Sequence, residues 1–273
     1  MSVIVGLLGA WILIIVGMLM KGGSIAGIIN IPAFLMVIGG TTGALIASFG
    51  LKEVMSMIKL TTGVALQERP DTRPETIRTL VGFSEKARRE GLLVLEEDAR
   101  DVDDPFLAKG VRLVVDGTDP ELVKDILETE LDSMEERHHR NQDMFKQGGA
   151  FAPTIGILAT VLSLVSVLQH LDKPDTLGPA ISAAFLATFY GVAVANIAYL
   201  PIANALKKKT AQEAGERMLI IEGVLSIQSG DNPRVLADKL WSFLPPDARE
   251  REAEPGEEAA GAPRGAEPVA EAA

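Results

Sequence analysis

Two threonines, Thr160 and Thr188, have the side-chain type that suits binding of a small cation within an otherwise apolar environment. A dehydrated cation needs oxygen ligands, and each of these hydroxyls lies inside a long uncharged stretch of the chain. Taken alone, however, a threonine in a membrane helix more often bonds a preceding carbonyl of its own helix. The residues by themselves leave both interpretations open.

Other residue types that carry chemistry form no convincing set. His138 and His139 are adjacent, so their side chains point about 100° apart on a helix, and no further ligands accompany them; we expect no metal site. The chain has no cysteine, no P-loop, no Ser-His-Asp set and no pair of catalytic carboxylates. We therefore expect no enzyme activity and no cofactor.

Four apolar stretches must position the two threonines. Each reaches or exceeds the roughly 18 apolar residues that cross a bilayer, and none contains Asp, Glu, Lys or Arg: residues 3–20, 25–51, 148–171 and 176–206. They form two pairs on either side of a charged block. The sequence therefore predicts an all-α integral membrane protein with four transmembrane helices in a 2+2 plan and a helical insertion.

The same pattern predicts the domain boundaries. Within the central block, Pro74, Pro105 and Pro120 are typical of helix starts and Gly91 of a helix end. The tail beyond 249 consists mainly of Ala, Glu, Pro and Gly, so we expect disorder there. The predicted segments are transmembrane helices 1 and 2 (1–51), a cytoplasmic helical domain (52–147), transmembrane helices 3 and 4 (148–206), cytoplasmic helices (207–249) and a disordered tail (250–273).

Basic residues near the ends of the spans predict the orientation. Lys52, Lys59 and Lys146 border the central block, and the run 207–209 is Lys-Lys-Lys. The positive-inside rule therefore places the block, the tail and, by parity, both termini in the cytoplasm. The net charge of −11, without a basic stripe interleaved with aromatics, gives no reason to expect nucleic-acid binding.

The apolar stretches lack something that ion-moving proteins usually have. Such proteins hold an ionisable group at membrane depth, and none of the four stretches contains an Asp, Glu, Lys or Arg. If this chain moves ions, a partner must supply the carboxylate.

Three parts of the sequence resemble the MotA/PomA family of flagellar stator subunits. They are ARREGLLVLEED at 87–98, the paired segments FAPTIGILATVLSLV at 151–165 and AAFLATFYGVAVANIAYLPIA at 183–203, and MLIIEGVLSIQSGDNPRVLADKLWSFLPP at 218–246. In this order the resemblance covers nearly everything from residue 22 to residue 249.

The resemblance implies partners that account for the missing charge. In this family several copies, described as five, surround a pair of MotB/PomB-type single-span chains that are anchored to peptidoglycan and carry a membrane Asp. Flow of a cation, sodium or proton, across the bacterial inner membrane drives motion of the ring against this pair. Membrane lipid surrounds the complex.

The resemblance also implies roles for individual residues. Thr160 and Thr188 match the threonines of the family's ion path. Sodium-driven members are understood to prefer Thr over Ala at the position of Thr160, so we favour sodium over the proton. Asn30 stands where sodium-driven members resemble one another in having an acidic residue, and an amide cannot supply that charge, which weakens the sodium interpretation. We expect Tyr190 to be a packing residue.

Two prolines, Pro153 and Pro201, match family prolines at the cytoplasmic ends of the third and fourth spans. The resemblance implies a hinge at Pro153, through which ion release changes the cytoplasmic shape. The alternative is that these prolines mark a helix start and a helix stop.

A bipolar run of charge surrounds the predicted turn at Gly91. A charge run is usually a solvated face. Here Arg88 and Glu96 match the family positions that engage a FliG-type rotor protein of the C-ring, which implies a rotor contact made by Arg88, Arg89, Glu96, Glu97 and Asp98.

Two other protein classes remain open: a TolQ/ExbB-like energy-coupling subunit, which resembles a three-span plan, and a simple ion channel or carrier.

Overall fold

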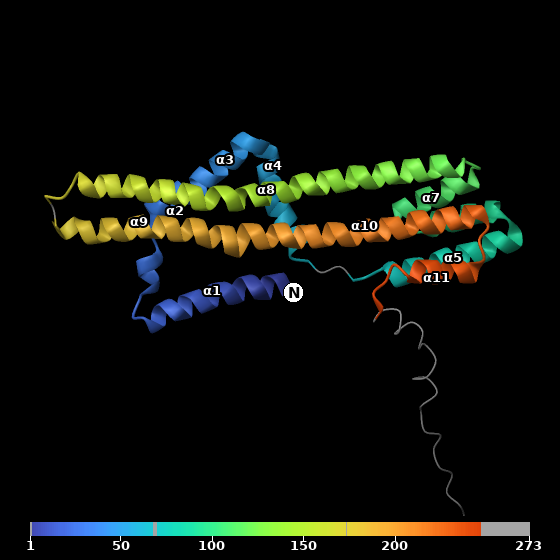
Figure 1. Ribbon diagram of the computed structural model, residues 1–273, viewed down its shortest axis with the longest axis horizontal. Coiled ribbons are helices and arrows are strands. Elements are labelled where there is room, and N and C mark those ends of the chain that lie inside the picture. Colours follow the sequence, from blue (N-terminus) through green and yellow to red (C-terminus); the bar gives the residue numbers. More distant parts are fainter. Residues whose placement is uncertain (1, 68–69, 173, 247–273) are drawn as a thin grey trace, which may run out of the picture. The chain divides into compact units, whose positions relative to one another are not determined.

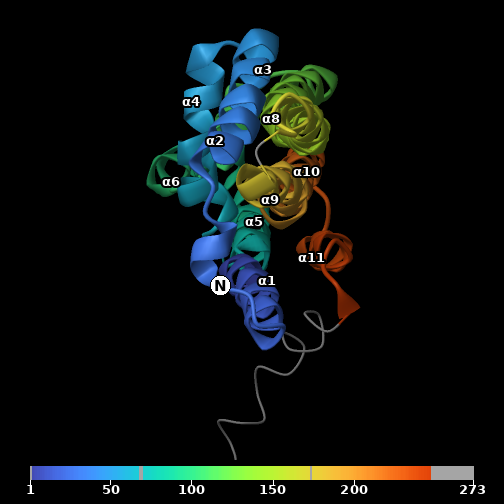
Figure 2. The same ribbon diagram turned by 90° about the vertical axis from the view of Figure 1, so that its left-hand side faces the viewer.

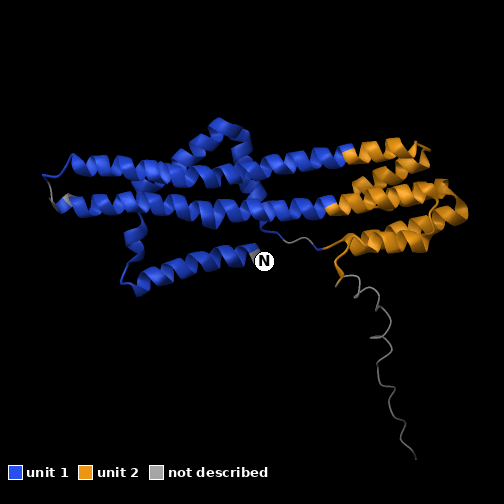
Figure 3. Cartoon of the chain, in the orientation of Figure 1, with its two compact units in different colours: residues 1–70, 129–214 blue, residues 71–128, 215–273 orange. Residues whose placement is uncertain are grey.

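The computed structural model describes residues 2–67, 70–172 and 174–246, and these residues form helices and turns without a strand. They divide into two compact units, one built from residues up to 70 together with 129–214, the other from 71–128 and from 215 onward (Figure 3). The predicted block 52–147 thus contributes to both units. The tail predicted to be disordered, 250–273, lies outside the described residues.

The first unit begins with two apolar segments (Figure 1). Helix α1 (Ser2–Met20) is the first candidate span, followed by the short 3₁₀ helix η1 (Ile25–Ile28). The second span is one run made of α2 (Ile31–Phe34), the π-helical η2 (Leu35–Gly39) and α3 (Gly40–Phe49). It ends at Gly50, whose φ of 90° lies in the region that favours glycine.

After Gly50 the chain forms α4 (Leu51–Leu60) and the π-helical η3 (Thr61–Ala65). The third span belongs to α8 (Pro120–Leu168), a helix of 49 residues, which is about 74 Å long at 1.5 Å per residue. The fourth belongs to α9 (Pro174–Val194), the π-helical η5 (Ala195–Tyr199) and α10 (Leu200–Ser229). Four helical segments are long and apolar enough to cross a membrane in the described chain.

The two prolines do not bound these long helices as a start and a stop. Pro153 lies inside α8, and Pro201 is the second residue of α10, directly after η5. That alternative is therefore wrong. Proline is tolerated within membrane helices where neighbouring groups satisfy the backbone that it frees.

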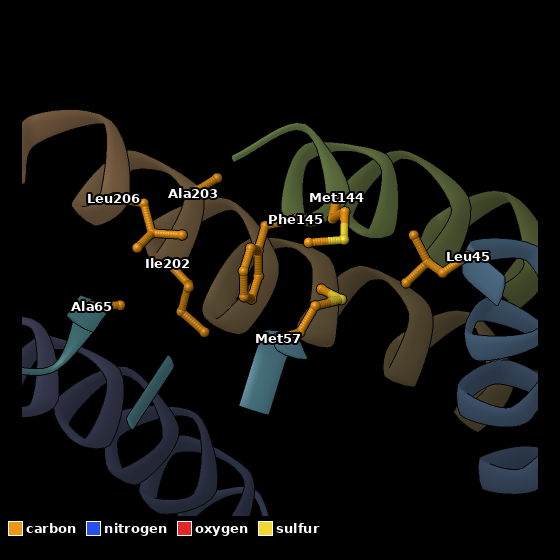
Figure 4. Packing of buried hydrophobic residues seen from close by; sticks show 8 residues of the cluster. All are labelled: Leu45, Met57, Ala65, Met144, Phe145, Ile202, Ala203 and Leu206. Carbon is orange, nitrogen blue, oxygen red and sulfur yellow. The ribbon is translucent and has the colours of Figure 1, made fainter. Parts of the chain in front are cut away.

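Two buried clusters hold the first unit together. One joins the second span and α4 to the long helices (Figure 4): Leu45, Met57, Ala65, Met144, Phe145, Ile202, Ala203 and Leu206. The other consists of small side chains, Ala33, Val37, Ala159 and Ala187, which permit close approach of membrane helices. Figure 2, a view turned by 90°, shows α2 beside α9 and α1 set apart from both.

The second unit contains α5 (Arg73–Glu90), η4 (Leu92–Val94), α6 (Leu95–Asp101), α7 (Pro105–Val115) and α11 (Pro233–Trp241), with the first part of α8 and the last part of α10. The predicted helix end at Gly91 and the predicted starts at Pro105 and Pro120 are confirmed. Gly223 fits under Leu80, because a Cβ at this glycine would lie 2.6 Å from the Leu80 Cδ1.

Candidate functional site

The two predicted path threonines meet between α8 and α9. Thr160 Oγ1 lies 2.6 Å from Thr188 Oγ1, and both side chains are half-buried. Thr160 Oγ1 also lies 3.0 Å from the carbonyl oxygen of Gly156, in its own helix, and 2.8 Å from that of Ala184 in α9. The pair therefore links the third and fourth spans directly.

Counting protons shows what this pair offers to a ligand. A hydroxyl has one proton to donate and two lone pairs, so Thr160 donates to one carbonyl only. When Thr160 donates to Ala184, the shorter of its carbonyl contacts, Thr188 donates to Thr160 Oγ1 and every proton has an acceptor. Thr188 Oγ1 then keeps both lone pairs, since no hydrogen bond to it from another described residue is present. The pair presents acceptor oxygen, the ligand type of a dehydrated cation.

Two glycines permit this approach of the helices. A Cβ at Gly156 would lie 3.0 Å from the carbonyl oxygen of Ala187, and a Cβ at Gly191 would lie less than 3.0 Å from the carbonyl oxygen of Ala152. Backbone therefore contacts backbone on both sides of the crossing. Sequence reasoning did not single out these glycines, although their spacing from Thr160 and Thr188 places them on the same helix faces.

Asn30 has a local structural task. Its Oδ1 accepts from the backbone N–H of Ala33 at 3.0 Å and caps α2. Its own backbone N–H donates to the Tyr190 hydroxyl at 3.0 Å, and that hydroxyl donates to the carbonyl of Ile28. Within the described residues, no hydrogen bond connects Asn30 to either path threonine.

Tyr190 is thus more than a packing residue. Its ring packs edge-on against Phe34 with 6.1 Å between the ring centroids, and its hydroxyl fixes the backbone that leads into the second span. The polar end of a buried tyrosine usually finds such a partner. A tyrosine two residues after Thr188 in an apolar span was the signal for this role.

Helical hydrogen bonding is interrupted around both prolines. Pro153 has no N–H for the carbonyl of Gly149, four residues earlier, and the next residue, Thr154, donates its hydroxyl to the Phe151 carbonyl at 2.8 Å. Pro201 is the second residue after the π-helical η5, another irregular turn. The long helices therefore have identifiable weak points at these positions.

The second unit carries the bipolar run at the turn between α5 and α6. Arg88 and Glu97 are exposed and form no ion pair with another described residue. Arg89 lies 3.8 Å from Glu85, and Glu96 lies 2.8 Å from Arg100, each pair one helical turn apart and exposed. Such pairs are weak and salt-sensitive, so these charges remain accessible to a partner.

Asp98 differs from its neighbours in the run. Both of its carboxylate oxygens accept from Lys86 Nζ, at 2.9 and 2.7 Å. The hydrogen bond to Asp98 raises the pKa of the Lys86 ammonium above its ordinary 10.5, so the pair is intact at neutral pH. Leu93, in η4 at the same turn, is 74% exposed. Sequence reasoning missed both Lys86 and Leu93.

Comparisons with known proteins agree with this architecture. Residues 98–218 match the model of the MotA/TolQ/ExbB proton channel family. The chain is 40% identical to motility protein A of Bacillus subtilis, over 93% of this chain and 94% of that protein. It is 33% identical to chemotaxis protein PomA of Vibrio alginolyticus, over 89% of this chain and 95% of that protein.

A solved structure shows the same fold. A chain of the flagellar MotAB stator complex from Bacillus subtilis superposes with a TM-score of 0.86 at 40% identity, covering 93% of this chain and all of that one. The four candidate spans of the described chain also differ from the three-span plan expected of a TolQ/ExbB-like subunit. This chain belongs to the MotA/PomA family of flagellar motor stator subunits.

Proposed function

We propose that this chain couples cation flow across the bacterial inner membrane to torque on a flagellar rotor. The observation that carries the proposal is the Thr160–Thr188 pair, which offers acceptor oxygen within apolar stretches that contain no Asp, Glu, Lys or Arg. A MotB/PomB-type single-span partner supplies the membrane carboxylate. Several copies of this chain, five in the family description, surround two such partners, with both termini of each copy in the cytoplasm.

Sodium is the coupling ion in this proposal. A sodium ion that has lost part of its hydration shell needs replacement oxygens, and the Thr188 hydroxyl keeps two lone pairs for this purpose. Ala159 and Ala187, which directly precede the two threonines in the sequence, are buried against Ala33 and Val37 of the second span, and small residues of this kind let membrane helices pack closely. Asn30 contributes no charge, so the partner's carboxylate supplies the anion.

The irregular helical turns at Pro153 and at η5 and Pro201 transmit the effect of ion binding and release. Pro153 lies seven residues before Thr160 in α8, and η5 and Pro201 lie beyond Thr188 on the following helix. A change in charge at the partner's carboxylate alters how the partner helix packs on these spans. The irregular turns are where the long helices change direction at the least loss of backbone hydrogen bonding.

The exposed charges of the second unit contact the rotor. Arg88 and Glu97 lack intramolecular ion pairs in the described part of the chain, and Glu96 is held only by an exposed neighbour. Pairs of this kind are worth about 1 kcal/mol or less each, which suits a contact that forms and breaks repeatedly. Charge reversal at Arg88, rescued by the opposite reversal on a FliG-type rotor protein, tests this contact; additive damage from the two reversals contradicts it.

Thr160→Ala tests the ion path. We expect swimming speed in a sodium medium to fall at least tenfold, and the sodium concentration for half-maximal speed to rise, because one oxygen ligand and the hydroxyl partner of Thr188 are lost. Thr154→Ala is the matched control, since Thr154 is exposed on the same helix and bonds only α8 carbonyls. Equal sodium dependence of Thr160→Ala and wild type contradicts sodium coupling through this pair.

A further inference from the structure

Helix α1 is the least integrated of the four candidate spans. The segment Val3–Met20 has the highest mean hydropathy of the four, 2.7, yet none of its residues is buried in the described chain. Its contacts with the rest of the first unit include η5. Figure 1 shows the helix diverging from α9 toward its own C-terminal end.

This divergence opens a cleft of about 560 Å³ between α1 and α9. Its volume lies within the range of small-ligand sites. Trp11 and Met18 line it from α1, and Gly178, Ser182 and Phe185 line it from α9. The Phe185 side chain is 69% exposed. Nearly all of the lining is apolar, so water gains too few hydrogen bonds to fill the cleft.

A lysine lies at the end of the cleft near Met18. A second hollow, which shares Met18 with the cleft, is lined by Gly17, Lys21 and Gly23. Lys21 directly follows α1, is exposed, and forms no ion pair with another described residue. A lysine at the end of a membrane helix extends its ammonium to the depth of the lipid headgroups. An apolar cleft and an available cation are thus joined at one end of α1.

We propose that the cleft binds one phospholipid, with an acyl chain between α1 and α9 and its phosphate on Lys21. The apolar lining accounts for the chain, and the charge of Lys21 complements the phosphate. A helix from a second copy of this chain is the competing occupant, because Asp172 and Asp175 border its third and fourth apolar stretches; the crosslinking experiment below separates it from lipid. The bound lipid fills the space that α1 leaves and holds this helix against α9.

Native mass spectrometry of the full-length, assembled protein tests the site. The probes are phosphatidylglycerol and a diacylglycerol with the same acyl chains. We expect saturation at one phosphatidylglycerol per chain and about fivefold weaker retention in Lys21→Gln, the effect of one basic residue at the membrane surface. Retention of diacylglycerol should be the same in Lys21→Gln and wild type.

Filling the cleft should prevent binding of both probes. Gly178→Leu places a side chain in the cleft, and a Cβ at Gly178 meets no atom within 4 Å. Gly6→Leu is the matched control, since Gly6 has the same open surroundings on α1 but does not line the cleft. Ser182→Phe is a second filling variant in case Gly178→Leu does not assemble.

Two results would overturn the proposal. One is unchanged lipid retention in assembled Gly178→Leu or Ser182→Phe protein. The other comes from a photoreactive benzophenone amino acid in place of Phe185, which we expect to yield a lipid adduct. A covalent adduct with a second copy, or with the single-span partner, instead of lipid would assign the cleft to that protein.

Discussion

Replacing Gly191 with alanine should displace the Thr160–Thr188 pair, although Gly191 contributes no ligand to the ion path. The added Cβ would lie less than 3.0 Å from the Ala152 carbonyl oxygen and 3.2 Å from the Gly156 Cα, whereas ordinary contact begins at 3.4 Å. Both neighbours are backbone atoms that cannot rotate away. Helices α8 and α9 must therefore separate by roughly 0.5–1 Å at this point.

The separation acts on the threonine pair one turn away. Thr188 lies three residues before Gly191, and its hydroxyl is 2.6 Å from that of Thr160. An increase of even 0.5 Å exceeds the usual range of an O–H···O hydrogen bond, about 2.5–3.0 Å. We expect a loss of about 1–3 kcal/mol of stability from overpacking, and a loss of about 10- to 100-fold in ion-driven motility from displacement of the site.

Thermal unfolding of the purified protein and swimming speed measure the two effects. Gly43→Ala is the control, because a Cβ at Gly43, in the second span, meets no atom within 4 Å; this variant should match wild type in both assays. Wild-type stability together with wild-type motility in Gly191→Ala would refute the argument that backbone contact sets the distance between the threonines.

Four further substitutions test other parts of the structure. Tyr190→Phe removes the hydroxyl that bonds the backbone before the second span and should lower stability by about 1–3 kcal/mol; an unchanged unfolding temperature contradicts this. Gln142 is buried, and its Oε1 has no hydrogen-bond partner among the described residues, while its Nε2 donates to the Thr210 hydroxyl at 2.9 Å. Gln142→Leu should therefore leave stability unchanged or raise it, whereas Thr210→Val should lower it by about 1–3 kcal/mol; the reverse order in thermal unfolding would show that the amide is satisfied. The hydrogen bond to Asp98 raises the pKa of Lys86 above 10.5. The difference in stability between wild type and Lys86→Met should therefore be present at neutral pH and be lost as the pH rises through that raised pKa. A difference that vanishes near neutral pH contradicts the pairing.

Most of the fold could be predicted from the apolar stretches and the turn residues. Uncharged runs of sufficient length can only be membrane helices, and glycine or proline at Gly91, Pro105 and Pro120 left few alternatives for the soluble helices. The continuation of one helix through Pro153 was harder to predict, because proline is compatible with a helix start or with a position inside a membrane helix. Tertiary packing, which the local sequence does not encode, decides between them.

The site was predictable in its residue types but not in its geometry. The sequence around a threonine in an apolar span does not show whether its hydroxyl bonds its own helix or a neighbouring one. Thr160 contacts carbonyls of both. The role of Gly191 depends on which face of α9 meets α8, and the pairing of Lys86 with Asp98 depends on how α5 and α6 pack. These relations exist only between elements.

The central claim is that this chain supplies oxygen ligands while a partner supplies the carboxylate. Cation flux into liposomes tests it most directly, with the purified chain reconstituted alone and together with a MotB/PomB-type partner, intact or with its membrane Asp replaced by Asn. We predict flux only with the intact partner, reduced at least tenfold by Thr160→Ala. Selective cation flux through the chain alone, at the rate of the complex, would contradict the account.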